Sequence, residues 1–316
     1  MRGALALLMV AGVWPAFASQ VASAPCSLQG IASAGSDIWL LCDRLEAYVS
    51  TDGGQTWQGR QLPSDQRLRA IAFLDARRGF VAGDGGTLLS TEDGGRSWRQ
   101  AAVETTENLT SIQFVGDWGW VCGWTGVILH SKDGGRTWKR QPTGILQGLK
   151  SIFFIDREHG WAAGWAGTIL RTVNGGETWE QARMEKSHWS LESIYFRDLS
   201  HGWAVGFGGL ILASRDGGVT WREQESPTQA WLKSVTFDGA GRGWIAADNQ
   251  ALLSEDGGAS WKSIAVPGSP FLHRVLGLKD ALWAVGQFGV LRSTATGREL
   301  TVVATLPGAK QAGGPS

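Results

Sequence analysis

Ser50-Thr51-Asp52-Gly53-Gly54-Gln55-Thr56-Trp57 is one copy of a short motif that recurs along this chain of 316 residues. Further copies span residues 91–98, 131–138, 172–179, 214–221 and 254–261. The tryptophans that close the six copies follow one another at intervals of 41, 40, 41, 42 and 40 residues. A fixed period of this size is typical of repeat architectures, in which each copy belongs to one unit of supersecondary structure.

A second marker lies upstream of each motif and shows that the chain holds seven units. It is an aromatic residue that opens a short apolar stretch, at Trp39, Phe80, Trp120, Trp161, Trp203, Trp244 and Trp283. The last unit keeps this aromatic residue but has Ser-Thr-Ala-Thr-Gly at 293–297, where the motif would stand. We expect the seventh unit to retain its blade although its turn has diverged.

Each unit contains four short apolar runs, which in one copy cover residues 149–155, 161–164, 168–171 and 178–183. Gly, Asp or Asn separates the runs. Short strands at intervals of about ten residues, with a repeat period near 40, are typical of a four-stranded propeller blade. No run shows the period of 3.6 that a helical solenoid needs. The sequence therefore predicts an all-β fold, a seven-bladed β-propeller of four-stranded antiparallel blades.

The recurring motif suits the tight turn between the third and fourth strands of a blade. An Asp or Asn side chain accepts hydrogen bonds from nearby backbone N–H groups, and Gly adopts positive φ without a steric clash. The Trp can then pack between neighbouring sheets. We therefore assign a structural role to the acidic or amide residue of each copy, namely Asp52, Asp93, Asp133, Asn174, Asp216 and Asp256.

The N-terminus has the features of a secretory signal peptide. Arg2 precedes an apolar stretch, and small residues follow at Ala16 and Ala18, so we expect cleavage after Ala18. We expect the propeller to span residues 19–307 and residues 308–316 to form a disordered tail. A lipoprotein would instead use Cys26, but Ala24-Pro25 is a poor approach to a lipidated cysteine. The predicted location is exported, either periplasmic or lumenal.

The charge balance argues against nucleic-acid binding. Lys plus Arg total 29 and Asp plus Glu total 29, so no overall positive charge attracts a polyanion. Beyond the signal peptide no apolar run approaches the length of about 20 residues that crosses a bilayer. We expect a monomer without direct membrane insertion.

The repeats carry a family resemblance. The motif is the Asp box of the bacterial neuraminidase repeat, and residues 153–179 and 196–221 show the wider pattern best. Over residues 27–306 the chain resembles the photosystem II stability and assembly factor family. The resemblance implies a non-catalytic lumenal or periplasmic propeller, which binds a membrane protein or its assembly intermediate. That family engages its client through an arginine-rich patch, but no individual arginine of this chain can be matched to it.

One face of the predicted ring carries the candidate binding residues. In a propeller this face combines the loops between second and third strands with the loops that lead into first strands. The aromatic candidates are Trp124, Trp165, Phe207, Phe288, Trp189 and Trp231. The basic candidates are Arg69, Lys150, Lys233 and Arg274, and His273 stands at an equivalent entry position. Aromatic and arginine residues are enriched at protein interfaces. The alternative is that these rings pack only against neighbouring blades.

The cysteines suggest one disulfide. Cys26 and Cys42 flank the first predicted hairpin at similar distances from its turn, and an exported protein permits the bond. Cys122 lies in an apolar strand and is expected to be a buried free thiol. The histidines are dispersed, and His159 and His201 occupy equivalent turn positions, so we expect no metal site and no cofactor.

The enzyme alternative is a glycoside hydrolase, either sialidase-like or β-glucan-cleaving, and a carbohydrate-binding propeller is related to it. A sialidase needs a tyrosine nucleophile with a glutamate and an arginine clamp. Tyr48 precedes a motif copy and Tyr195 lies in an apolar run, so neither suits that role. The acid pair Asp156 and Glu158 stands near a turn, where carboxylates are usually solvated. We therefore predict a protein that is not an enzyme.

Overall fold

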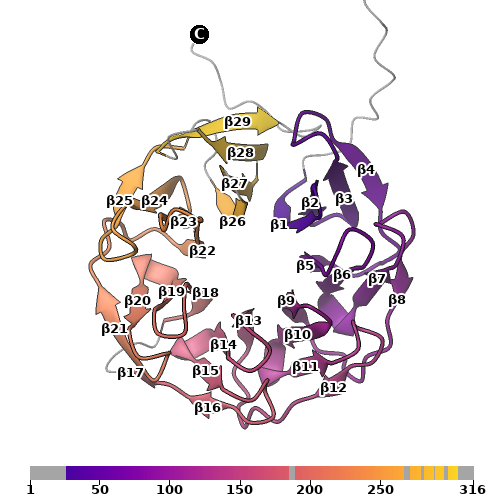
Figure 1. Cartoon of the computed structure of the whole chain (residues 1–316), viewed down its shortest axis with the longest axis horizontal. Helices are drawn as coiled ribbons and strands as arrows, with labels where there is room; N and C mark the ends of the chain where they lie inside the picture. The colour runs from indigo at the N-terminus through magenta and orange to yellow at the C-terminus, as the bar shows by residue number, and fades with distance from the viewer. Residues whose placement is uncertain are drawn as a thin grey trace, which may run out of the picture.

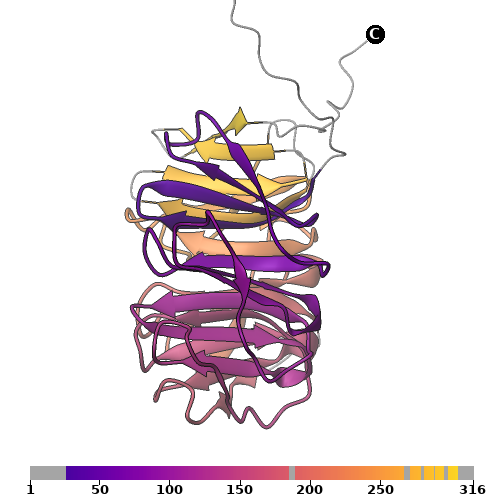
Figure 2. The same cartoon turned by 90° about the vertical axis from the view of Figure 1, so that its right-hand side faces the viewer.

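The computed structural model describes residues 26–184, 189–266, 271–278, 281–287, 289–294 and 298–304. The expected signal peptide (1–18) and C-terminal tail (308–316) lie outside these residues. Seven separate β-sheets form a closed ring, which confirms the seven-bladed propeller (Figure 1). Seen edge-on, the ring is a disc with a blade's strands spanning its thickness (Figure 2).

Each blade consists of consecutive antiparallel strands, numbered from the centre outward. Blade 1 comprises β1 (Leu28–Ala34), β2 (Asp37–Cys42), β3 (Glu46–Ser50) and β4 (Gln58–Gln61). Blade 2 comprises β5 (Leu68–Phe73), β6 (Gly79–Gly83), β7 (Leu88–Thr91) and β8 (Arg99–Gln100). Blade 3 comprises β9 (Leu109–Val115), β10 (Trp118–Gly123), β11 (Ile128–Ser131) and β12 (Lys139–Arg140). Blade 4 comprises β13 (Leu149–Phe154), β14 (Gly160–Gly164), β15 (Ile169–Thr172) and β16 (Glu180–Gln181).

The remaining blades follow the same order. Blade 5 comprises β18 (Leu191–Phe196), β19 (Gly202–Gly206), β20 (Ile211–Ser214) and β21 (Thr220–Gln224). Blade 6 comprises β22 (Leu232–Phe237), β23 (Gly243–Ala247), β24 (Gln250–Ser254) and β25 (Lys262–Ile264). Blade 7 comprises β26 (Leu272–Leu278), β27 (Ala281–Gly286), β28 (Gly289–Ser293) and β29 (Leu300–Ala304).

Blade 5 departs from the four-stranded expectation. A short strand, β17 (Arg183–Met184), pairs in parallel with β21 and adds a fifth strand to this sheet. The sequence pattern predicts a single strand at 178–183 in blade 4. Instead, β16 ends at Gln181 and the chain crosses to the next blade, because Ala182 and Met184 pack against the apolar cluster between blades 4 and 5.

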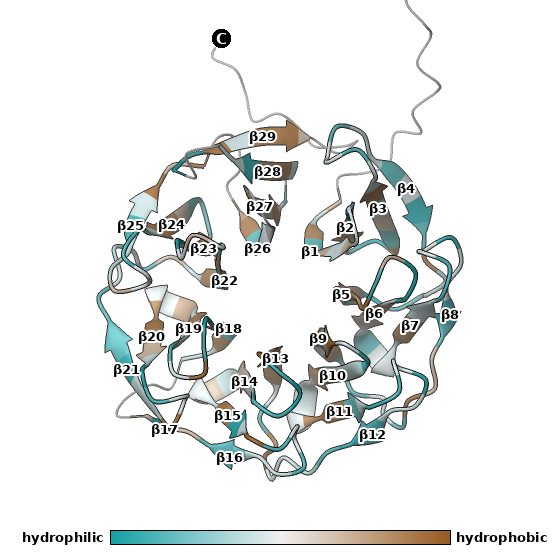
Figure 3. Cartoon of the chain, in the orientation of Figure 1, coloured by the Kyte–Doolittle hydropathy of each residue, from teal (hydrophilic) through white to brown (hydrophobic). Residues whose placement is uncertain are grey.

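The core lies between neighbouring blades. Second strands such as β6, β14 and β19 are buried at every residue, whereas outer strands such as β8 and β12 are short and polar (Figure 3). Large rings join adjacent sheets, and Trp161 of blade 4 stacks on Phe196 of blade 5 with ring centroids 3.5 Å apart. Burying one such side chain contributes about 2–3 kcal/mol. Because the second strands are buried at every residue, each sheet needs a neighbour on both faces.

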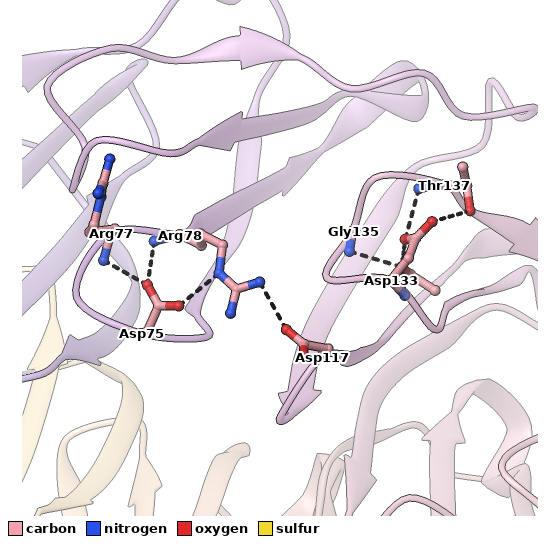
Figure 4. Close-up of polar contacts among 8 residues, drawn as sticks. Asp75, Arg77, Arg78, Asp117, Asp133, Gly135 and Thr137 are labelled. Carbon is pink, nitrogen blue, oxygen red and sulfur yellow. Dashed lines mark hydrogen bonds and ion pairs between the residues drawn. The ribbon is translucent and has the colours of Figure 1, made fainter.

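The Asp-Gly-Gly turns of blades 1 to 6, with Asn-Gly-Gly in blade 4, join third and fourth strands on one face of the disc. The turn of blade 3 illustrates their bonding (Figure 4). The Thr137 hydroxyl donates to Asp133 Oδ2 at 2.6 Å, and the Thr137 N–H donates to Asp133 Oδ1 at 3.0 Å. The Gly135 N–H donates to the Ser131 hydroxyl at 2.8 Å. Gly134 and Gly135 both have positive φ, 74° and 82°, which glycine adopts most readily.

The ring closes by packing blade 1 directly against blade 7. Leu28 and Leu40 of blade 1 share an apolar cluster with Trp283 and Val285 of blade 7. Nδ1 of His273 lies 3.0 Å from the carbonyl oxygen of Leu28. A disulfide joins Cys26 to Cys42, with Cα atoms 5.7 Å apart, and holds the start of β1 against the end of β2.

Candidate functional site

The seven inner strands share a one-residue bulge near their first residue. The register between first and second strand skips the residue after the leading leucine in every blade. A bulge bends the strand locally and changes the direction of a side chain. The skipped residues are Gln29, Arg69, Thr110, Lys150, Glu192, Lys233 and His273.

In blades 3 to 7 the next residue along the first strand bonds to a neighbouring blade. Ser111 Oγ accepts a hydrogen bond from the backbone N–H of Ile152 at 3.3 Å, and Ser193 Oγ accepts one from Val235 at 3.2 Å. The same bond recurs at Ser151 and Ser234. Blade 7 has Arg274 at this position, and its Nη1 donates to the carbonyl of Lys233 at 3.3 Å. These bonds link blades 3 to 7 next to the bulged residues.

These seven side chains, one from each blade, line a single pocket at the mouth of the central channel. Its volume is about 420 Å³. We call it the channel-mouth pocket, and its other lining residues are Ser27, Asp43, Arg67, Trp231 and Arg274. The sequence analysis missed Gln29, Thr110 and Glu192, although aligning the residue after each repeat's leading leucine would have found them.

The channel-mouth pocket is cationic. Its lining includes five Lys and Arg side chains, from Arg67, Arg69, Lys150, Lys233 and Arg274, against the carboxylates of Asp43 and Glu192. Arg69 is held by Asp84, with Nη2 donating to Oδ2 at 2.9 Å. Burial lowers the pKa of Lys233 to about 8, and burial also lowers the pKa of Arg274. The pocket can therefore attract an anionic group.

An arc of aromatic rings borders this pocket over blades 3 to 6. Trp124 contacts Trp165 with ring centroids 5.3 Å apart. Phe207 contacts both Trp189 at 5.3 Å and Trp231 at 5.6 Å. Trp165, Phe207 and Trp189 expose 37%, 44% and 56% of their surface. Exposed rings at this density are unusual on a surface without a binding role.

Local backbone geometry presents several of these rings. Short 3₁₀ turns connect second and third strands: η1 (Asp84–Gly86), η2 (Trp124–Gly126), η3 (Trp165–Gly167) and η4 (Phe207–Gly209). The middle residue of each turn has positive φ, including Thr125 and Ala166 at 53°. The first residue of each turn is therefore carried at the edge of the channel-mouth face.

Cationic side chains lie against the aromatic arc. Arg69 lies 5.8 Å from the centre of the Trp124 ring, and Lys150 lies 5.6 Å from that of Trp165. The structure thus gathers nine of the ten candidate binding residues on one face. The tenth, Phe288, lies outside the described residues. Trp124 is half-buried. Its ring therefore fits both the binding interpretation and the alternative that it packs against a neighbouring blade.

The two tyrosines lie apart from this face. Tyr48 is buried in the cluster between blades 1 and 7 and donates to Glu46 Oε2 at 2.9 Å. Burial, followed by the Glu46 carboxylate, raises the pKa of Tyr48 to about 12. Burial also raises the pKa of Tyr195. Both shifts disfavour the phenolate that a nucleophile requires.

The acidic turn residues bind their own loops. Asp156 Oδ1 accepts hydrogen bonds from the backbone N–H groups of Glu158 and His159, and Asp198 accepts them in the same way from Ser200 and His201.

Cys122 is a buried free thiol, and burial raises its pKa to about 12. No helix among the described residues is long and apolar enough to cross a bilayer.

The ring of sheets and its repeated sequence units define a seven-bladed β-propeller built from BNR-type repeats. Within this class the chain belongs to the family described as photosynthesis system II assembly factor YCF48. The family's sequence model matches residues 49–147 and 188–305, more than half of the chain.

Individual relatives agree over shorter lengths. The chain is 33% identical over 67 residues to the photosystem II assembly lipoprotein Ycf48 of Parasynechococcus marenigrum, covering 20% of each protein. The chain covers less than a quarter of each curated relative that it matches. The structure of YCF48 bound to D1 peptide is 22% identical, with a TM-score of 0.71 over 85% of this chain and 91% of that one.

The same fold also occurs in an enzyme. Virginiamycin B lyase from Staphylococcus aureus is 13% identical, with a TM-score of 0.73 over 83% of this chain and 92% of that one. At these identities the structural likeness concerns the fold alone, so function must be argued from the residues of the site.

Proposed function

We propose that this chain is an exported, non-catalytic propeller that binds a membrane-protein client during assembly of a larger complex. One observation carries the proposal: a cationic channel mouth and an arc of exposed aromatic rings share one face of the disc. Membership in the YCF48 family supports it, as does the similarity in fold to a propeller solved with a D1 peptide.

The chemistry of this face suits an extended polypeptide segment. Exposed Trp165, Phe207 and Trp189 offer a broad apolar surface whose rings lose little rotamer entropy on binding. Cations beside the rings would pair with carboxylates of the client and guide its approach. Because the rings span adjacent blades, a segment lying along the arc would contact several repeats at once.

Export belongs to the same proposal and rests on the predicted signal peptide. The disulfide between Cys26 and Cys42 suits an oxidising compartment. It also occupies the Cys26 sulfur, which a lipid anchor would need. We therefore propose a periplasmic or lumenal protein, monomeric and without a lipid at Cys26. Size-exclusion chromatography and intact mass measurement of the processed protein would test both statements.

The non-catalytic part of the proposal is supported by the environments of Tyr48, Asp156 and Asp198. Their hydroxyl or carboxylate groups are engaged within their own blades, and the raised pKa of Tyr48 opposes nucleophilic attack. Assays with a sialoside and a β-glucan should therefore show no turnover. Turnover that disappears in Tyr48→Phe or Asp156→Asn would contradict this part of the proposal.

The direct test is capture of a client from membranes of the source organism. We expect the processed protein to retain one membrane polypeptide, which a Trp165→Ala/Phe207→Ala variant should lose. Leu199→Ala is the matched control, because Leu199 is 50% exposed but lies in the turn between β18 and β19, on the opposite face. Equal retention by all three proteins would refute the assignment of the binding face.

A further inference from the structure

The face opposite the aromatic arc contains a repeated feature that the client-binding proposal does not use. Here the fourth strand of one blade approaches the glycine-rich motif turn of the following blade, and we call the space between them an interblade slot. Between blades 3 and 4 the slot is full. Trp120 Nε1 and Gln141 Nε2 both donate to the carbonyl of Gly175, at 2.9 Å and 3.0 Å, and His130 stacks on Trp120.

The slot between blades 5 and 6 is filled in nearly the same way. Trp203 Nε1 and Gln224 Nε2 both donate to the carbonyl of Gly258, each at 3.0 Å. Only a hollow of about 130 Å³ remains there. Between blades 4 and 5 a small residue, Ala182, replaces the glutamine, but Met184 of β17 packs beside it.

The slot between blades 2 and 3 differs at three positions of the repeat. Phe80 stands in place of Trp120, Ser90 in place of His130 and Ala101 in place of Gln141. All three replacements reduce side-chain size or remove a polar group. The result is a cavity of about 850 Å³, which we call the blade 2–3 slot. This volume is in the range of small-molecule sites.

The same replacements leave a hydrogen-bond acceptor without its usual donors. Phe80 has no N–H, and Ala101 has no amide, so the carbonyl of Gly134 lacks the indole and glutamine bonds that Gly175 receives. A methyl group added at Gly176 would come closest to the Gln141 amide, whereas one added at Gly135 would come closest to the Phe80 ring. A bound ligand with an N–H or O–H group could supply the missing donor.

The mouth of the blade 2–3 slot carries four arginines, of which two lack a carboxylate partner. Arg78 is bonded to Asp75 at 2.7 Å and to Asp117 at 2.8 Å (Figure 4), and Arg99 is bonded to Glu92 at 2.6 Å. Arg77 and Arg136 form no ion pair within the described part of the chain. Guanidinium groups bind carboxylates and phosphates through paired N–H donors.

The slot between blades 1 and 2 offers a comparison. It is also hollow, at about 620 Å³, but retains Trp39 and has Arg60 at the position of Ala101. Arg77 lines both cavities. The long cationic side chain of Arg60 therefore lines the slot between blades 1 and 2, whereas Phe80 and Ser90 line the blade 2–3 slot.

We propose that the blade 2–3 slot is a binding site for a small organic oxyanion that also carries an N–H or O–H group. Its carboxylate or phosphate pairs with Arg77 and Arg136 at the mouth. Its hydrogen-bond donor reaches the carbonyl of Gly134, and its carbon skeleton lies over Phe80. This slot shares no lining residue with the channel-mouth pocket, so its occupant would not compete with a client for the same side chains.

The proposal is tested by calorimetric titration of the processed chain with glutamate, citrate, glucose 6-phosphate and inorganic phosphate. We expect at least one organic probe to bind with a Kd below about 1 mM, and phosphate alone to bind more weakly because it lacks the skeleton. An affinity that is equal for all four anions, or weaker than about 1 mM for each, would overturn the proposal.

Variants that copy residues of neighbouring blades sharpen the test. Ala101→Gln should place an amide where Gln141 lies in blade 3, maintain or raise Tm, and weaken binding at least tenfold. Arg136→Gln should weaken it several-fold. Arg96→Gln is the matched control, since Arg96 holds the same motif position in blade 2 and lies outside this slot. Unchanged affinity in both Ala101→Gln and Arg136→Gln would show that the probe binds elsewhere.

Discussion

The ammonium nitrogen of Lys233 lies 2.8 Å from the centre of the Trp231 ring. Burial lowers the pKa of this lysine to about 8, while the nearby carboxylate of Asp248 acts in the opposite direction. The aromatic face also favours the charged form. The charge of Lys233 is therefore sensitive to pH just above neutrality.

Client capture should depend on pH through Lys233. Below about pH 8 the lysine is protonated and contributes to the positive potential of the pocket, and above this value it becomes neutral. Retention of an anionic client should therefore fall as the pH rises from 7 to 9, by an amount that corresponds to the loss of one positive charge. Lys233→Arg stays charged over this range and should give a flatter profile. An identical profile in the two proteins would assign the pH dependence to another group.

The aromatic arc should contribute to capture more than to stability. Trp165→Ala should weaken client retention tenfold or more, equivalent to about 1.4 kcal/mol, because the ring is exposed and central to the arc. Trp124→Ala should affect both retention and Tm, since Trp124 is half-buried against Trp165. Thermal melts alongside binding curves separate these effects. Unfolding of Trp165→Ala would place that ring in the core instead.

The Asp-Gly-Gly turns should tolerate amides but not apolar residues. Asp133→Ala removes the acceptor of the Thr137 hydroxyl and N–H, and should cost about 1–3 kcal/mol. Asp133→Asn should be close to neutral, because Asn174 occupies the equivalent position in blade 4 and accepts the N–H of Thr178 at 3.0 Å. Chemical denaturation of both variants compares them directly. Equal loss of stability in the two would mean that charge is required at this turn.

Loss of the disulfide should destabilise the closure of the ring. Cys26→Ser/Cys42→Ser frees the start of β1, and the chain-entropy estimate for a loop of this length is about 3 kcal/mol. Reductant should lower the Tm of the parent protein and leave that of the variant unchanged. A parent protein insensitive to reductant, or free thiols at both positions by mass spectrometry, would contradict the pairing.

Repetition made most of the fold predictable. Six copies of one motif and seven upstream aromatic residues indicated the blade structure and the number of blades. In a repeat fold of this kind each sheet buries both faces against neighbours that have the same architecture. The same period placed Trp124, Trp165 and Phe207 in equivalent loops. Because consecutive strands of a blade run in opposite directions, equivalent loops lie on the same face of the ring, so the sequence predicted that these three rings share a face.

Tertiary structure alone decided which departures from the repeat matter. The channel-mouth pocket depends on a strand bulge. The repeat aligns the seven bulged residues, but only the register between β-strands shows that they line one pocket. The blade 2–3 slot depends on Phe80, Ser90 and Ala101 meeting the turn of another blade. Each of these three residues is ordinary within its own repeat. Only the packing of one sheet against the next shows that together they are too small to fill the slot.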